Sequence, residues 1–158
     1  MSSNIAHPPA GGLVIQKEIT VLGSAESAFR RFTEGIAGWW PTATHSIGQN
    51  ETVAVVFEGR EGGRVFELQS DETVAVWGTL TVWDPPHRFA MSWHPGHGDD
   101  RATELDVRFE PAPEGARVRL RHSGWEVLGD DAQATCRLYT TGWDPVLARF
   151  ALTEGETG

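Results

Sequence analysis

The sequence predicts an α+β fold in which a curved antiparallel sheet of about six to seven strands wraps around a long C-terminal helix, with two short helices after the first strand. Three observations support this prediction. Residues 13–22 alternate as a strand does, and residues 24–36 have helical spacing. Residues 52–123 contain strand patterns separated by turn residues, and residues 130–152 return to helical periodicity.

The segment after the first strand is predicted to contain a helix and then a short helix or turn. Ser24 is suited to cap the helix, because its side-chain oxygen can accept a hydrogen bond from a free backbone N–H. Apolar residues within 25–36 recur at helical spacing, and glycines and Pro41 then end the helix. Trp39 and Trp40 therefore fall on the short helix or turn that follows.

The middle of the chain reads as an antiparallel meander, since short alternating runs are joined by tight turns. Its expected strands are residues 52–58, 64–69, 73–83, 88–94, 103–109 and 117–123.

Residues 130–152 are predicted to form the helix that covers the sheet. Tyr139, Trp143, Val146 (or Leu147) and Phe150 fall on one face of it. Pro145 lies inside this pattern, and we expect a kink there. A long helix laid across a curved sheet leaves a cavity between the two.

The alternation of side chains along each strand indicates which residues face that cavity. On the third strand, Phe66 and Leu68 are preferred over Val65 and Glu67, because the first pair is more apolar. Trp77 and Trp83 stay ambiguous on the fourth. The other residues expected to face inward are Phe89, Met91, Trp93, Thr103, Leu105, Val107, Phe109, Val118, Leu120 and His122.

Several of these residues are candidates for a binding site, each beside a plainer interpretation. His122 could bind a polar group of a ligand or act as a general base, or it could be a core histidine with a satisfied partner. Trp39, Trp40 and His45 could form a lid over the cavity mouth or a hydrophobic plug. The aromatic residues that could line a pocket, or simply pack the core, are Phe89, Trp93, Tyr139 and Trp143.

Composition narrows the function classes. The chain has 158 residues, which suits one domain, expected over residues 13–153 with a disordered leader (1–12) and tail (154–158). Its net charge of −9 argues against nucleic acid and anionic membranes as partners.

The sequence contains one cysteine, Cys136, and no signal-peptide pattern, so we expect the protein to be located in the cytoplasm. The loop around His94 and His97 is a weak metal candidate, so we expect no metal and no cofactor.

The sequence resembles the bacterial branch of the family named for the activator of the heat-shock protein 90 ATPase, within the START-like (SRPBCC) superfamily. The matching segments are SAESAFRRF (24–32), WWP (39–41) with HS (45–46), EGGRVFE (61–67), WGTLTVWDPPHRFAMSWHPG (77–96), ATELDVRF (102–109), VRLRHSGWE (118–126) and YTTGWDPVLARF (139–150). The resemblance implies a helix-grip (Bet v 1-like) fold with a hydrophobic cavity. Its relatives bind lipids, sterols or polyketides, and some act as polyketide cyclases or hydrolases.

Three functions follow as hypotheses. The first is binding of a small apolar or aromatic molecule in the cavity. The second is a cyclase-like or hydrolase-like enzyme that uses His122 as a base with Glu67 or Tyr139. The third is an interaction protein, either a co-chaperone or a homodimer that pairs through exposed strand faces bearing Trp77 and Trp83.

Overall fold

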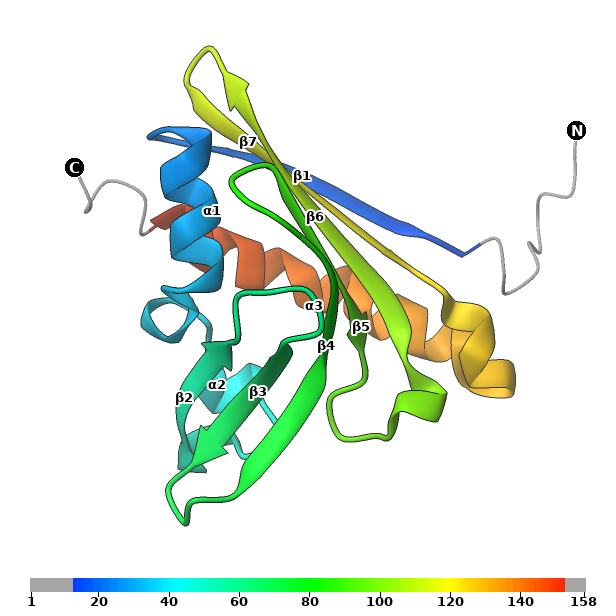
Figure 1. Ribbon diagram of the computed structural model, residues 1–158. Coiled ribbons are helices and arrows are strands. Elements are labelled where there is room, and N and C mark those ends of the chain that lie inside the picture. The colour runs from blue at the N-terminus through cyan, green and yellow to red at the C-terminus, as the bar shows by residue number, and fades with distance from the viewer. Residues whose placement is uncertain (1–12, 153–158) are drawn as a thin grey trace, which may run out of the picture.

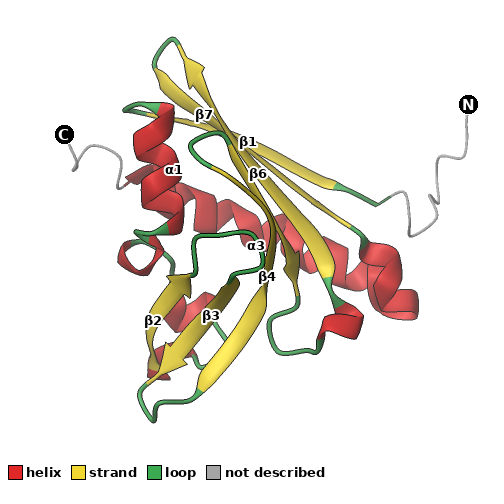
Figure 2. Cartoon of the chain, viewed as in Figure 1, coloured by secondary structure: helices red, strands yellow, loops and turns green. Residues whose placement is uncertain are grey.

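The computed structural model describes residues 13–152, and the predicted leader (1–12) and tail (154–158) lie outside them. Seven antiparallel strands form one curved, half-barrel sheet in the order β1-β7-β6-β5-β4-β3-β2 (Figures 1 and 2). The predicted α+β class and helix-grip architecture are confirmed. The strands are β1 (Ile15–Val21), β2 (Thr52–Phe57), β3 (Arg64–Gln69), β4 (Val74–Asp84), β5 (Arg88–Trp93), β6 (Thr103–Ala112) and β7 (Gly115–Ser123).

Helices pack on one face of this sheet. The helix α1 (Ala25–Thr33) begins where the Ser24 hydroxyl accepts a hydrogen bond from the Ser27 amide, at 3.0 Å. Its Phe32 ring lies 5.7 Å from the Phe109 ring of the sheet and 5.1 Å from the Phe150 ring of α3 (Ala132–Leu152). The two helices therefore share one core with the sheet. The short helix α2 (Thr42–His45) and a 3₁₀ turn (Ile36–Gly38) connect α1 to β2.

The long helix α3 spans the sheet and runs without interruption through Pro145 (Figure 1). A 3₁₀ segment, Trp125–Asp131, precedes it, and the backbone turns sharply at Gly129, which has a positive φ of 58°. The break in the C-terminal helical region therefore lies at Gly129, where glycine tolerates a conformation that other residues avoid.

Strand β4 departs from simple alternation at two points. Its register against β3 shifts between Val65 and Phe66, and its register against β5 shifts between Leu80 and Val82. Each shift behaves as a β-bulge, which reverses the faces of the residues beyond it. Consequently Trp77 and Leu80 are both 1% exposed, and Trp83 packs 5.1 Å from the Phe29 ring. The idea that Trp77 and Trp83 form an outer face for dimerisation is therefore wrong.

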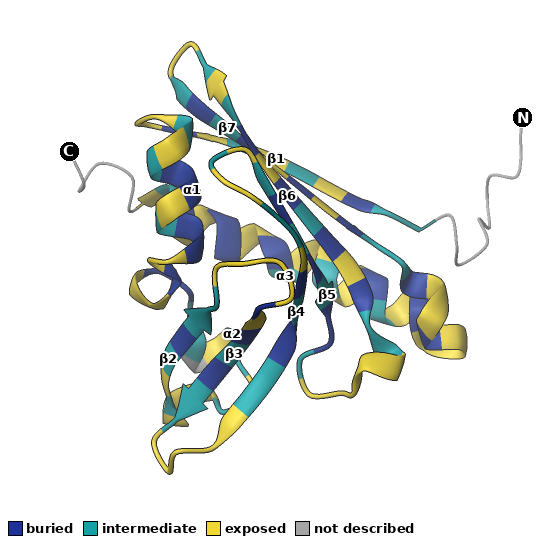
Figure 3. Cartoon of the chain, in the orientation of Figure 1, coloured by how far each residue is buried: buried dark blue, intermediate teal, exposed yellow. Residues whose placement is uncertain are grey.

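The predicted orientation of β3 is also wrong. Val65 and Glu67 are fully buried, while Phe66 and Leu68 lie on the opposite face and are half-buried (Figure 3). The guanidinium of Arg64 sits 5.2 Å above the Phe66 ring. The sequence favours Phe66 and Leu68 because they are the more apolar pair, and burial of a charged group is costly. Glu67 avoids that cost through hydrogen bonds described below.

The faces of β5, β6 and β7 are as predicted, because these strands alternate regularly between buried and more exposed residues (Figure 3). Their buried residues include Phe89, Met91, Trp93, Leu105, Val107, Leu120 and His122.

Candidate functional site

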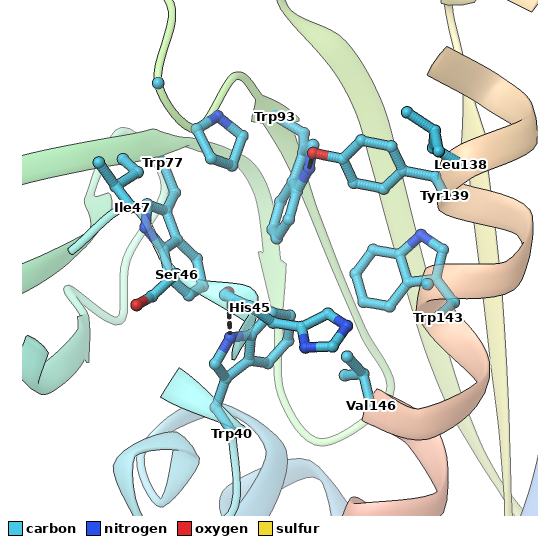
Figure 4. A pocket seen from close by; sticks show the side chains of 13 residues that line it. Trp40, His45, Ser46, Ile47, Trp77, Trp93, Leu138, Tyr139, Trp143 and Val146 are labelled. Carbon is cyan, nitrogen blue, oxygen red and sulfur yellow. Dashed lines mark hydrogen bonds between the residues drawn. The ribbon is translucent and has the colours of Figure 1, made fainter. Parts of the chain in front are cut away.

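A cavity of about 490 Å³ lies between α3, the inner face of β4 and β5, and the segment that begins with α2 (Figure 4). The elements that build it are far apart in sequence, from residue 40 to residue 146. The residues that line it are Trp40, His45, Ser46, Ile47, Trp77, Trp93, Pro95, Gly96, Leu138, Tyr139, Gly142, Trp143 and Val146.

Four tryptophans dominate its walls. The ring of Trp40 lies 5.1 Å from Trp77 and 5.9 Å from Trp143, and the ring of Trp93 lies 5.6 Å from Trp77 and 5.5 Å from Trp143. Tilted and edge-on contacts of this kind are favourable for aromatic pairs. The four rings therefore brace one another, and the cavity has rigid aromatic walls.

The indole N–H of each of these tryptophans is already used within the protein. Trp40 donates to the His45 carbonyl at 2.7 Å, and Trp93 donates to the Tyr139 hydroxyl at 3.1 Å. The remaining two indoles donate to Glu67 Oε1, from Trp77 at 2.7 Å, and to His122 Nδ1, from Trp143 at 3.1 Å. None of these four indole N–H groups is therefore free to donate to a ligand.

Glu67 holds one side of the cavity in place. Its carboxylate accepts hydrogen bonds from the backbone N–H groups of Ile47 and Gly48, at 2.8 and 2.6 Å, so it anchors the segment that carries Ser46 and Ile47. Burial raises the pKa of Glu67, and the hydrogen bonds that its carboxylate accepts lower it. The combined lowering is larger than the effect of burial, so the pKa of Glu67 lies below its ordinary value. Its other donors are Thr52, Gln69 and Trp77.

Two side chains bring titratable polar groups to the cavity. The Tyr139 hydroxyl accepts a hydrogen bond from Trp93, and burial raises the pKa of this phenol, so it stays protonated. The His45 ring lies between Trp40 and Val146 (Figure 4), and its Nδ1 is 2.7 Å from the Thr44 hydroxyl. These groups occupy different walls of an otherwise apolar space.

Of the predicted site residues, Trp40, His45, Trp93, Tyr139 and Trp143 line this cavity. The two tryptophans of the pair lie in different places: Trp40 borders the cavity, and Trp39 packs in the core 4.9 Å from the Phe32 ring. The predicted residues that the structure places outside the cavity lining are Trp39, Phe66, Phe89, Met91, Leu105, Val107, Leu120 and His122.

His122 lies behind the Trp143 wall and is fully buried. Because Trp143 donates to Nδ1, the ring proton belongs on Nε2, which lies 2.7 Å from the Thr103 hydroxyl. Burial lowers the pKa of His122 to about 3. Both ring nitrogens are therefore occupied by the protein, and the structure supports the interpretation of a satisfied core histidine.

Several residues that line the cavity are not among the site residues predicted from the sequence. Val146 carried a signal, since it shares the helical face of Tyr139 and Trp143. The orientation of Trp77 does not follow from alternation, because the bulges of β4 interrupt it. Pro95, Gly96, Ser46 and Ile47 lie in loops, where periodicity gives no orientation, and Leu138 and Gly142 border the opening from α3.

The described residues contain no group of three or more His, Cys, Asp or Glu side chains that could hold a metal ion.

The single cysteine, Cys136, is buried, and burial raises the pKa of its thiol. Within residues 13–152, no helix combines the length and apolar character that a membrane span requires.

Comparisons with known proteins agree with this architecture. The family model described as "Activator of Hsp90 ATPase homolog 1-like protein" matches residues 23–153. No curated protein matches the chain. Among solved structures, the anthrahydroquino-γ-pyrone synthase Txn09, complexed with SUM, is 36% identical, with 91% of this chain and 98% of that chain covered and a TM-score of 0.62.

Two more distant structures share the fold. The Aha1 dimer from Colwellia psychrerythraea is 19% identical, with 92% of this chain and 99% of that chain covered and a TM-score of 0.65. A protein from Mesorhizobium loti is 15% identical, and the match covers 89% of this chain and 95% of that chain with a TM-score of 0.66.

Proposed function

Since the chain belongs to the family of activator of Hsp90 ATPase homolog 1-like proteins, we propose that its cavity binds a flat, polycyclic aromatic molecule. The observation behind this proposal is the set of four tryptophans whose N–H groups are all engaged within the protein. Such walls present ring faces and edges, which favour stacking and edge-on contacts with another aromatic ring. They offer few hydrogen bonds to a flexible polar ligand.

The size of the cavity fits such a ligand. At about 490 Å³ it lies within the range of roughly 300–1,000 Å³ that is usual for pockets of drug-sized molecules. The rigid rings also fix its shape before binding, so little ordering entropy is lost on association. The 36% identity to an anthrahydroquino-γ-pyrone synthase supports fused aromatic rings as the ligand class.

Calorimetric titration with anthracene-2-sulfonate, a water-soluble three-ring probe, tests this proposal. We expect saturable binding and a raised melting temperature, since a ligand that binds only the folded state stabilises it. A control probe, dodecyl sulfate at submicellar concentration, carries a similar charge on a flexible aliphatic chain. Tighter binding of the aliphatic probe than of the aromatic one would contradict the proposal.

The variant Gly142→Leu provides the matched control for the site. Gly142 lines the cavity, and a Cβ placed on it would meet no atom within 4 Å. A leucine there begins in open space at its Cβ and extends into the cavity. Binding should be lost while the melting temperature of the free protein stays at or above that of the unaltered chain.

A second candidate function is a ring-closing enzyme that acts on the same ligand class, which the named synthase relative supports. The base that we propose for such a reaction is His45 rather than His122, because His45 lines the cavity. Proton transfer requires a group within hydrogen-bond reach of the substrate. Conversion of a linear aromatic polyketide precursor, lost in His45→Gln but kept in His122→Gln, would distinguish catalysis from binding.

We also propose a homodimer formed through the outer face of β2, β3 and β4. Several cross-strand neighbours on this face are apolar, as Val56 pairs with Phe66 and Phe66 pairs with Val76, and the Arg64 guanidinium lies over the Phe66 ring. The family relative from Colwellia psychrerythraea, which is a dimer, supports a second copy as the occupant. We define the outer apolar face as Ala54, Val56, Phe66, Leu68, Val74 and Val76.

A further inference from the structure

The polar groups that face the cavity are few, and most of their hydrogen-bonding capacity is already used. The four indole N–H groups donate to protein acceptors, and the Ser46 hydroxyl donates to the Thr42 carbonyl at 2.6 Å. A ligand that enters the cavity therefore meets aromatic and aliphatic side chains, the His45 ring and the Tyr139 side chain.

The Tyr139 hydroxyl keeps one unused hydrogen. Within residues 13–152, its hydrogen bond with Trp93 is the single one that it makes, and there the phenol oxygen is the acceptor. The indole also fixes this oxygen in place, because the Trp93 ring packs against Trp77 and Trp143. A hydroxyl that accepts one hydrogen bond becomes a better donor for the next one.

We infer that the Tyr139 hydroxyl donates a hydrogen bond to a carbonyl or phenolate oxygen at the edge of the bound aromatic molecule. The site would then select oxygenated, quinone-like rings over plain aromatic hydrocarbons. This inference rests on the proposed function, and it names the ligand class of the same cavity.

The physical reason for selection is the cost of an unpaired donor. When a hydrocarbon fills the cavity, it displaces water from the hydroxyl and offers no acceptor in return. When a ring with an edge oxygen binds, the hydrogen bond replaces the one to water. A site that contains a hydrogen-bond donor therefore discriminates against ligands that lack the matching acceptor.

Two matched probes test the inference. Anthraquinone-2-sulfonate and anthracene-2-sulfonate share the three-ring frame and the sulfonate, and they differ in the two carbonyl oxygens. Calorimetric titration of the unaltered chain should show about tenfold tighter binding of the quinone, the discrimination expected of one good hydrogen bond. In the double variant Trp93→Phe, Tyr139→Phe, which leaves no Trp93 N–H without its acceptor, the ratio should fall to about one, through weaker binding of the quinone.

Trp93→Phe alone is the matched control: it removes the indole donor but leaves the Tyr139 hydroxyl, so a preference for the quinone should persist. The affinity for anthracene-2-sulfonate in the double variant should equal that in Trp93→Phe, because the second phenylalanine preserves the ring of Tyr139. The same ratio in the double variant as in Trp93→Phe, or a ratio near one in the unaltered chain, overturns the inference. Failure of both probes to bind the unaltered chain instead overturns the proposed function itself.

Discussion

At the level of single residues, His122 and Glu67 are buried polar groups whose hydrogen-bond partners lie mostly far away in the sequence. His122 receives the indole N–H of Trp143 and meets the Thr103 hydroxyl, while Glu67 receives five hydrogen bonds. Burial without such partners would cost several kcal/mol per group. These pairings allow a histidine and a carboxylate to sit in an otherwise aromatic core.

The burial of neutral His122 makes the fold sensitive to acid. Its folded-state pKa is about 3, whereas an unfolded chain takes up this proton near the ordinary value of about 6.5. The unfolded state therefore binds more protons between these values, and the free energy of unfolding falls as pH decreases from about 6.5 toward 3. Urea unfolding at pH 7, 6 and 5 should show a loss that approaches about 1.4 kcal/mol per pH unit.

The variant His122→Gln separates this effect from other titrations. Glutamine keeps a donor and an acceptor but does not titrate in this range. Between pH 7 and 5 its stability should depend on pH less steeply than that of the unaltered chain. Equal slopes for the two proteins would assign the acid sensitivity to other groups.

Removal of the Glu67 charge should destabilise the protein. In Glu67→Gln an amide N–H₂ replaces one oxygen, so donors that pointed at that oxygen would face another donor. We expect a loss of about 2–3 kcal/mol in the free energy of unfolding, measured in urea. Glu26→Gln, at an exposed site paired with Arg30, should cost no more than about 0.5 kcal/mol. Comparable small losses in both variants would show that Glu67 is not the anchor described above.

At the scale of elements, strand β4 decides the composition of the cavity wall. Its two register shifts place Trp77, Leu80 and Trp83 on the inner face at intervals of three, where a regular strand would alternate. Gly78, next to the first shift, permits the close approach of β5, because a side chain there would collide with the Ser92 carbonyl. The bulge thus delivers Trp77 to the cavity.

One substitution made at two glycines tests this role. Gly78→Ala should lower the free energy of unfolding by about 2–3 kcal/mol, since its Cβ overlaps backbone atoms that cannot move aside easily. Gly142→Ala should raise it by up to about 1 kcal/mol, because Gly142 is inside α3 with open space around it. Thermal and urea unfolding of both variants measure the contrast. Two changes of the same sign would be inconsistent with a close approach at Gly78.

At the scale of the whole molecule, the sheet has two unlike faces. The inner face holds the aromatic core and the cavity, and the outer apolar face defined above is half-exposed at β2–β4. Val74 is 48% exposed there, and contiguous apolar surface of this kind marks contact sites in other proteins.

Light scattering during size-exclusion chromatography tests the proposed homodimer. We expect the unaltered chain at twice its mass of 17.3 kDa, and Phe66→Glu at the mass of one chain. Val127→Glu, which adds the same charge at an exposed apolar residue in the 3₁₀ segment before α3, should remain dimeric. A monomeric unaltered chain would remove the outer apolar face as an interface.

The amino-acid pattern alone predicts the order of strands and helices, the inward faces of β5, β6 and β7, and the helix face that carries Tyr139 and Trp143. Those properties depend on local periodicity, which the amino-acid pattern records directly. The family resemblance added the helix-grip architecture, which the family match and the shared fold confirm.

Only the tertiary structure decided where the cavity lies and which groups remain free in it. The hydrogen bond from Trp93 to Tyr139 joins residues 46 positions apart, and the one from Trp143 to His122 spans 21. The register shifts of β4 also arise from pairing with its neighbouring strands. Contacts between distant segments produce no periodic pattern in the sequence. The orientations of Phe66 and Trp77, and the burial of His122 behind the cavity wall, therefore follow only from the folded chain.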